Sequence, residues 1–115
     1  MADDRKKPSL PEPVRSALRE LKAALAELYA ERLRGLYLYG SYARGTADDD
    51  SDIDVLIALE GEPSPFREID LLSDLLSEIC LRNNVLIAIY PVSERCLEER
   101  HDPLFESIRR EGVLL

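Results

Sequence analysis

Residues 40–57 spell GSYARGTADDDSDIDVLI, and this stretch decides how the chain folds. Gly40 and Ser41 end a short apolar run, which is typical of a strand that enters a tight turn. Asp52 and Asp54 stand one residue apart at the start of a second apolar run. The stretch therefore predicts a strand, a glycine turn, a short helix at residues 42–44, a polar loop at residues 45–51 and a second strand.

The residues before this stretch predict a helix that leads into the first strand. An apolar stripe with helical spacing runs from about Pro13 to Leu33. Its members are Val14, Ala17, Leu18, Leu21, Ala24, Leu25 and Leu28. We expect Gly35 to end this helix and residues 36–39 to form a buried strand.

Residues 52–59 predict a strand with two different faces. Ile53, Val55 and Ile57 point to one side, whereas Asp52, Asp54 and Leu56 point to the other. Ser64 and Pro65 are suited to begin the next helix. The apolar residues of that helix that we expect to face inward are Phe66, Ile69, Leu72, Leu75, Leu76 and Ile79.

The last third of the chain predicts one more strand and one more helix. Residues 85–90 are apolar on both sides, as in a strand that is covered on both faces, and Pro91 is expected to end it. Asp102 and Pro103 begin the last helix, and Gly112 ends it. The residues of this helix that we expect to face inward are Leu104, Phe105 and Ile108.

The predicted order of elements is αβαβαβα, which indicates an α/β (α+β) fold with a small mixed sheet and helices packed on it. We expect residues 1–12 to be a disordered N-terminal segment and residues 13–115 to form one domain. The chain has 115 residues, which is enough for a single core.

Charge and hydropathy limit the possible functions. The net charge is −8, which argues against nonspecific binding to nucleic acid and suits a basic protein partner. No apolar run approaches the roughly 20 residues that span a bilayer, and the first nine residues are polar and charged. We therefore expect a cytoplasmic protein with no membrane association.

The central stretch carries the residues that are suited to chemistry. Asp52 and Asp54, at i and i+2 of a strand, would project from one face about 6–7 Å apart and could hold divalent cations against a triphosphate. The backbone N–H groups of a Gly40–Ser41 turn can cradle a phosphate. Arg44 offers a planar fork of donors to phosphate, and an ion pair with an acidic neighbour is an equally good alternative. Ser51 is placed to hold the loop ahead of the strand.

Gly-Ser, ten residues and Asp-x-Asp, with Arg-Gly between them, closely resemble the nucleotidyltransferase superfamily, whose fold is like the palm of DNA polymerase beta. The short chain is similar to the minimal nucleotidyltransferases, and residues 102–105 and 110–114 also resemble the tail of that family. The resemblance implies a nucleotidyltransferase fold and transfer of AMP from ATP to a hydroxyl group, with release of pyrophosphate.

The resemblance also assigns the site and a partner. Asp52 and Asp54 would be catalytic and would hold two Mg²⁺ ions, while Gly40 and Ser41 would bind the triphosphate. Together with Arg44 and Ser51 they are the candidate nucleotide-binding residues. Relatives of this kind act as antitoxins of HEPN-family toxins, and some adenylylate their partner. We therefore expect an antitoxin that forms a hetero-oligomer or homo-oligomer.

Two alternatives stay open, and the first comes from a departure from the family. The family commonly has a third carboxylate on the third strand, but residues 85–90 contain no acid. Loss of a general base can lower a rate by roughly 10²–10⁴-fold. The first alternative is therefore a weak or inactive transferase that acts as an antitoxin by binding its toxin. The second is an adenylyltransferase of small molecules of the aminoglycoside type, which the acidic surface would suit.

Overall fold

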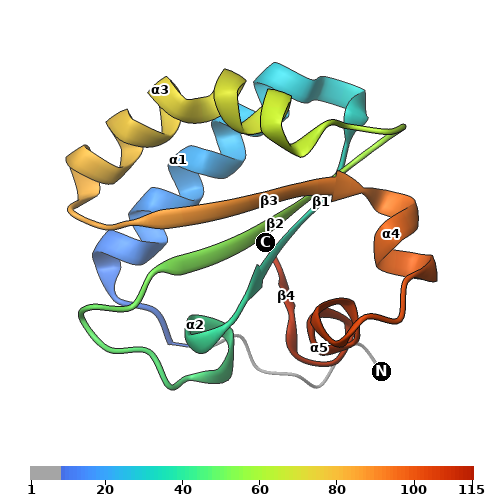
Figure 1. Cartoon of the computed structure of the whole chain (residues 1–115). Coiled ribbons are helices and arrows are strands. Elements are labelled where there is room, and N and C mark those ends of the chain that lie inside the picture. Colours follow the sequence, from blue (N-terminus) through green and yellow to red (C-terminus); the bar gives the residue numbers. More distant parts are fainter. Residues whose placement is uncertain (1–8) are drawn as a thin grey trace.

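The computed structural model describes residues 9–115 (Figure 1). Its elements are α1 (Glu12–Tyr29), a 3₁₀ turn η1 (Ala30–Arg32), β1 (Leu33–Tyr39), α2 (Ser41–Arg44), β2 (Ile53–Leu59), α3 (Pro65–Asn83), β3 (Ile87–Ser93), α4 (Glu94–Glu99), α5 (Pro103–Glu111) and β4 (Val113–Leu114). Residues 1–8 of the segment expected to be disordered lie outside the described part, and α1 begins at the last residue of that segment.

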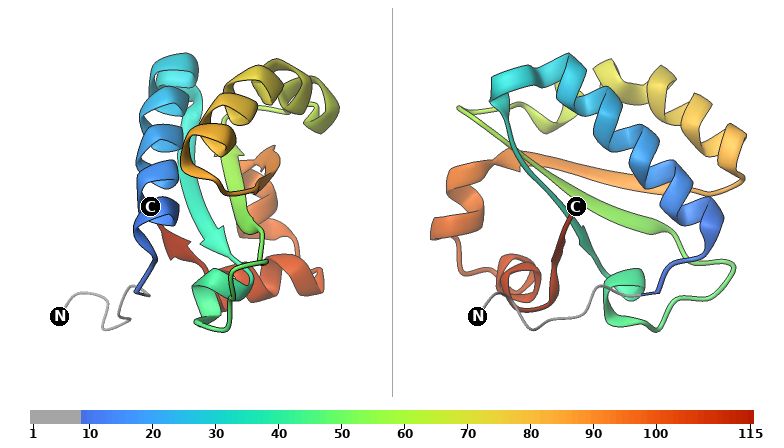
Figure 2. Two further views of the ribbon diagram at one scale, coloured as in Figure 1. Left: turned by 90° about the vertical axis from the view of Figure 1, so that its left-hand side faces the viewer. Right: turned by 180° about the vertical axis from the view of Figure 1, so that it is seen from behind.

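The four strands form one mixed sheet in the order β3-β2-β1-β4. β1 is antiparallel to β2 and to β4, whereas β2 and β3 are parallel and are connected through α3. α1 and α3 cover one face, and α1 crosses in front of the sheet when the molecule is viewed from behind (Figure 2). α5 packs on the opposite face. The predicted α/β class, with helices on a small mixed sheet, is confirmed.

Two apolar cores lie on the two faces of the sheet. The larger core joins α1 and α3 to β1 and β2, and Ile53, Val55 and Ile57 all belong to it. The smaller core joins Leu56 to Phe105 and Ile108 of α5. The predicted alternation of β2 is therefore confirmed. Its consequence for function is that residue 54 projects on the α5 face, two residues nearer to the Gly40 turn than the buried Leu56.

The predicted end of the first helix is wrong. α1 ends at Tyr29, Ala30 takes a left-handed φ of 50°, and Gly35 lies inside β1. Pairing of Leu33 with Leu59 of β2 draws residues 33–35 into the sheet. Gly35 is used for close approach, because a Cβ there would lie 2.6 Å from the ring of Tyr37.

Several predicted inward positions are also wrong. Phe66 and Ile69 of α3 are 87% and 40% exposed, and Leu104 of α5 is 38% exposed. Only the middle and end of the α3 stripe, Leu72 and Ile79, are buried in the larger core. The apolar stripe of α3 thus extends beyond the surface that α1 and the sheet can cover.

The third strand differs from the prediction in its residue range and in how far its two faces are covered by other elements. β3 runs from Ile87 to Ser93 and includes Pro91, which is tolerated because β3 is an edge strand that, among residues 9–115, pairs with β2 alone. Its first half is open on one face, since Ala88 is exposed. The sequence-based prediction also missed α4 and β4. Within residues 9–115, no helix is long and apolar enough to cross a membrane.

Candidate active site

The Gly40 turn and Asp54 are brought together by the pairing of β1 with β2. Tyr39, the last residue of β1, is the register partner of Asp54. Gly40 follows with φ of 77°, and a Cβ on it would overlap Oδ2 of Asp54. Glycine is therefore required at residue 40 for its conformation and for the room that the carboxylate needs. A group bound at this turn would lie directly against the Asp54 carboxylate.

Asp52 lies just before β2, where the prediction placed it in the strand, and its side chain is exposed. The pKa of Asp54 is raised, first because burial disfavours its charged form and second because the negative charge of Asp52 repels it; Arg44 acts in the opposite sense. The two carboxylates therefore interact, and the nearby positive charge does not fully offset their repulsion. A cation between them would relieve this repulsion.

Arg44 ends the short helix α2, and it has an acidic neighbour, which was one of the two alternatives for it. Nη1 of Arg44 lies 3.8 Å from Oε2 of Glu111 at the end of α5. An ion pair between such half-exposed side chains is worth about 0–1 kcal/mol. Arg44 also acts on the charge of Asp54, so its guanidinium lies near that carboxylate.

Ser41 and Ser51 lie on opposite sides of the polar loop. Ser41 is the first residue of α2, and the carbonyl of Gly40 accepts the N–H groups of Ala43 and Arg44 at 3.1 Å. The Ser51 hydroxyl accepts the N–H of Asp48 at 2.9 Å and donates to the Asp48 carboxylate at 3.2 Å. Ser51 therefore closes the loop ahead of β2, as predicted.

Sequence reasoning missed the neighbours that the sheet supplies to Asp54. Ala88 of β3 pairs with Asp54 in the parallel register, so a methyl group stands where a third carboxylate would lie beside it. Tyr39 flanks Asp54 on the other side, and its pKa is raised by burial and then by the charges of Asp54 and Tyr90. These neighbours come from different strands, and no local sequence pattern predicts that they meet.

The carboxylates of the site fit a magnesium ion whose coordination shell is completed by phosphate oxygens. Over the described residues 9–115, no three His, Cys, Asp or Glu side chains gather as a metal cluster. Asp52 and Asp54 supply carboxylate oxygens, and Mg²⁺ is commonly bound by one or two carboxylates together with substrate phosphates. The residues thus fit a metal that arrives with a nucleotide.

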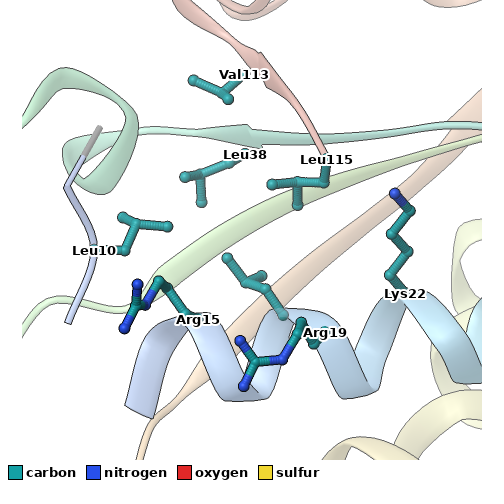
Figure 3. A pocket seen from close by; sticks show the side chains of 8 residues that line it. Leu10, Arg15, Arg19, Lys22, Leu38, Val113 and Leu115 are labelled. Carbon is teal, nitrogen blue, oxygen red and sulfur yellow. The ribbon is translucent and has the colours of Figure 1, made fainter. Parts of the chain in front are cut away.

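Two cavities of opposite character flank the sheet. Asp52 lines one of about 450 Å³, between the polar loop and the turn that joins α3 to β3. The other, of about 400 Å³, lies between α1 and β4 and has an apolar floor with Arg15, Arg19 and Lys22 around it (Figure 3). No predicted site residue lines the second cavity.

Comparison with known families agrees with this geometry. The model of the nucleotidyltransferase domain matches residues 18–100, and the chain therefore belongs to the nucleotidyltransferase family. A relative from Methanocaldococcus jannaschii, named "Putative protein adenylyltransferase MJ0604", is 31% identical over 100 residues, which are 86% of this chain and 94% of the relative. The protein adenylyltransferase MntA of Thermococcus cleftensis is 36% identical over 76 residues, 66% of this chain and 75% of that protein.

Solved structures share the fold. One described as a "putative minimal nucleotidyltransferase" is 29% identical, with a TM-score of 0.53, and the match covers 93% of this chain and 99% of that one. A toxin–antitoxin structure with AMP-PNP has a TM-score of 0.58 at 18% identity, covering 84% of this chain and 69% of that one. The predicted membership of the minimal nucleotidyltransferases is thereby confirmed.

Proposed function

We propose that this nucleotidyltransferase transfers AMP from ATP to a hydroxyl group on a partner protein, and that Asp52 and Asp54 carry the reaction. The observation that carries the proposal is the close approach of the Gly40 turn to the Asp54 carboxylate, because a glycine turn of this kind is suited to bind phosphate. The two relatives named as protein adenylyltransferases support the choice of a protein as acceptor.

The proposed reaction needs little more than positioning and charge from the chain. The Gly40–Ser41 turn holds the triphosphate, Arg44 neutralises a phosphate charge, and Ser51 keeps the loop before Asp52 in place. The acceptor oxygen forms a bond to the α-phosphorus, the bond to the bridging oxygen breaks, pyrophosphate leaves, and the hydroxyl proton passes to water. Bound Mg²⁺ would supply charge neutralisation on the triphosphate.

We further propose that the partner is a HEPN-family toxin and that the chain is its antitoxin. Support comes from the MntA relative and from the toxin–antitoxin structure that shares the fold. The net charge of −8 favours a basic partner.

Binding and transfer of nucleotide test the proposal directly. Titration calorimetry with ATP and Mg²⁺ should show binding that is lost in Asp52→Asn/Asp54→Asn. Asp49→Asn/Asp50→Asn is the matched control, because it removes the same charge from the adjacent loop. Label from α-labelled ATP should then appear on a co-expressed HEPN partner. Binding that is equal in both double variants, or no labelled protein at saturating Mg²⁺, would contradict the proposal.

One observation favours a second candidate, an antitoxin that acts by binding alone. The carboxylates of the site are those of Asp52 and Asp54, and Ala88, which cannot act as a base, occupies the position beside Asp54 on β3. On this alternative Asp52→Asn/Asp54→Asn still neutralises the toxin in a growth assay. Loss of neutralisation in a variant that remains folded would exclude the alternative and favour catalysis.

A further inference from the structure

The cavity beside Asp52 is a cleft with two chemically different walls, and we call it the acidic–apolar cleft. One wall is the loop that carries Asp49, Asp50 and Asp52, and the other is the turn from Cys80 to Leu86. The N–H of Ile53 donates to the carbonyl of Leu86 at 2.8 Å, so the two walls are joined at the base of the cleft. The cleft therefore has a fixed floor.

The apolar wall exposes leucine side chains that the fold holds outward. Leu81 is 84% exposed and Leu86 is 66% exposed. Between them, Arg82 forms an ion pair with Glu20 of α1 at 2.7 Å, and the Asn83 amide donates to Glu20 at 2.8 Å. These bonds tie the end of α3, which carries Leu81, to α1.

The acidic wall carries negative charge that the described chain does not neutralise. Within residues 9–115, no Lys or Arg forms an ion pair with Asp49, Asp50 or Asp52, and none lines the cleft. The cavity on α1 has the opposite charge (Figure 3). The acidic–apolar cleft thus suits an occupant with an apolar body and positive charge, and it repels a nucleotide phosphate that arrives without a cation.

We propose that the acidic–apolar cleft docks a segment of the protein partner in which an apolar or aromatic side chain is flanked by lysine or arginine. The apolar side chain packs between Leu81 and Leu86, and the cations face Asp49 and Asp50. This inference rests on the proposed function, since Asp52 belongs to both the cleft and the carboxylate pair. A hydroxyl on the docked segment would be delivered next to the site.

Peptide binding tests the cleft without nucleotide. The ¹⁵N-labelled chain is titrated with the blocked peptide KKLYKK, and NMR should show shifted amides at residues 49–52 and 80–86. The peptide KKSSKK should bind at least about fivefold more weakly, and EELYEE should not bind. Equal binding of KKLYKK and KKSSKK, or shifts confined to other elements, would overturn the proposal.

Surface variants sharpen the test. Leu81→Ser/Leu86→Ser should weaken KKLYKK binding at least about fivefold, and Asp49→Asn/Asp50→Asn should weaken it and flatten its salt dependence. Phe66→Ser/Leu71→Ser is the matched control, because these two α3 side chains are exposed like Leu81 and Leu86 but lie outside the cleft. The affinity of this control should stay within about twofold. An unchanged affinity in the leucine variant would refute the docking site.

The readouts separate this inference from the proposed function. If the chain binds Mg²⁺-ATP and labels its partner but does not bind KKLYKK at the cleft, the proposed function stands and the docking site is refuted. If the chain binds KKLYKK at the cleft but neither binds nor transfers nucleotide, the docking site stands and the proposed function is refuted.

Discussion

Gly40 and Asp54 depend on each other at the scale of single residues. The glycine is needed because the carboxylate occupies the space that a Cβ would fill, and the carboxylate is partly withdrawn from water beside this turn. The raised pKa of Asp54 shows that the folded chain holds an anion at a cost, at a place where two carboxylates interact. Stability and function therefore make opposite demands on this residue.

Gly40→Ala is expected to reduce both stability and nucleotide binding. A left-handed φ costs a residue with a Cβ roughly 1–2 kcal/mol, and overlap with Asp54 adds about 1–3 kcal/mol. Gly61→Ala is the matched control, since Gly61 has φ of 85° and a Cβ added there would meet no atom within 4 Å. Urea unfolding and calorimetry with Mg²⁺-ATP measure the difference. Equal losses in the two variants would show that the contact with Asp54 is unimportant.

Asp54→Asn is expected to stabilise the chain at neutral pH. The pKa of Asp54 is raised in the folded state, so the proton binds more tightly there than in the unfolded chain. The wild type is then relatively most stable below the unfolded pKa of about 3.9, and it loses this advantage as the pH rises through the folded pKa. The variant should therefore have the higher Tm at pH 7, and the gap should shrink at pH 3. A gap that grows toward acid pH would contradict the burial and repulsion described above.

At the scale of elements, α1 and α3 are fastened together at one end by a buried polar contact. The Tyr29 hydroxyl at the end of α1 donates to Oε1 of Glu68 at 2.6 Å, and both residues are buried. The pKa of Tyr29 is raised by burial and then by Glu68, so the phenol stays a donor at physiological pH. This contact joins the last residue of α1 to the first turn of α3.

Tyr29→Phe should lower the free energy of unfolding by about 1–3 kcal/mol, because Glu68 loses its donor inside the protein. Tyr42→Phe is the control, since the Tyr42 hydroxyl only reaches the carbonyl of Asp48 at 3.3 Å on the surface. That variant should change stability by no more than about 0.5 kcal/mol. Denaturant unfolding of both proteins gives the comparison, and equal effects would refute a special role for the buried pair.

The β2–β3 pairing predicts a gain of activity. Ala88→Asp places a third carboxylate beside Asp54 in the parallel register. If general-base help limits transfer, the rate should rise at least about tenfold, which is part of the roughly 10²–10⁴-fold that an optimally placed general base contributes. Ala26→Asp on the exposed side of α1 controls for added charge. A rate that is unchanged or lower in Ala88→Asp alone would show that the missing acid does not limit the reaction.

At the scale of the whole molecule, charge is divided between two cavities, an acidic one beside β2 and β3 and a cationic one between α1 and β4. The carboxylate pair and the acidic loop lie at one end of β2, while cations gather around the cavity between α1 and β4. A divalent ion that binds the carboxylate pair only in the folded chain should stabilise the whole fold by mass action.

Mg²⁺ is expected to raise the Tm of the wild type in the presence of ATP. A tenfold excess over Kd would add about 1.4 kcal/mol, and each kcal/mol raises Tm by roughly 4–8 °C in a domain of this size. EDTA should reverse the shift. Asp52→Asn/Asp54→Asn should show no shift, whereas Asp49→Asn/Asp50→Asn should retain it. A shift that survives in the first variant would place the ion elsewhere.

Local pattern determined much of this protein. The alternation of β2 and the short helix after Gly40 both follow from short-range geometry, because one period and one glycine turn specify them. The family resemblance likewise depended on residues 40–57, which form one continuous segment.

Only the tertiary structure decided which residues meet. The apposition of Gly40 with Asp54, the placement of Ala88 beside it and the pairing of Arg44 with Glu111 each join separate elements through sheet register or helix packing. Sheet register and helix packing also decided that α1 ends at Tyr29 and that the Phe66 side chain is exposed to solvent. Amphipathic periodicity shows that a residue could be buried, but burial needs a partner surface, and that surface exists only once the sheet and helices are assembled.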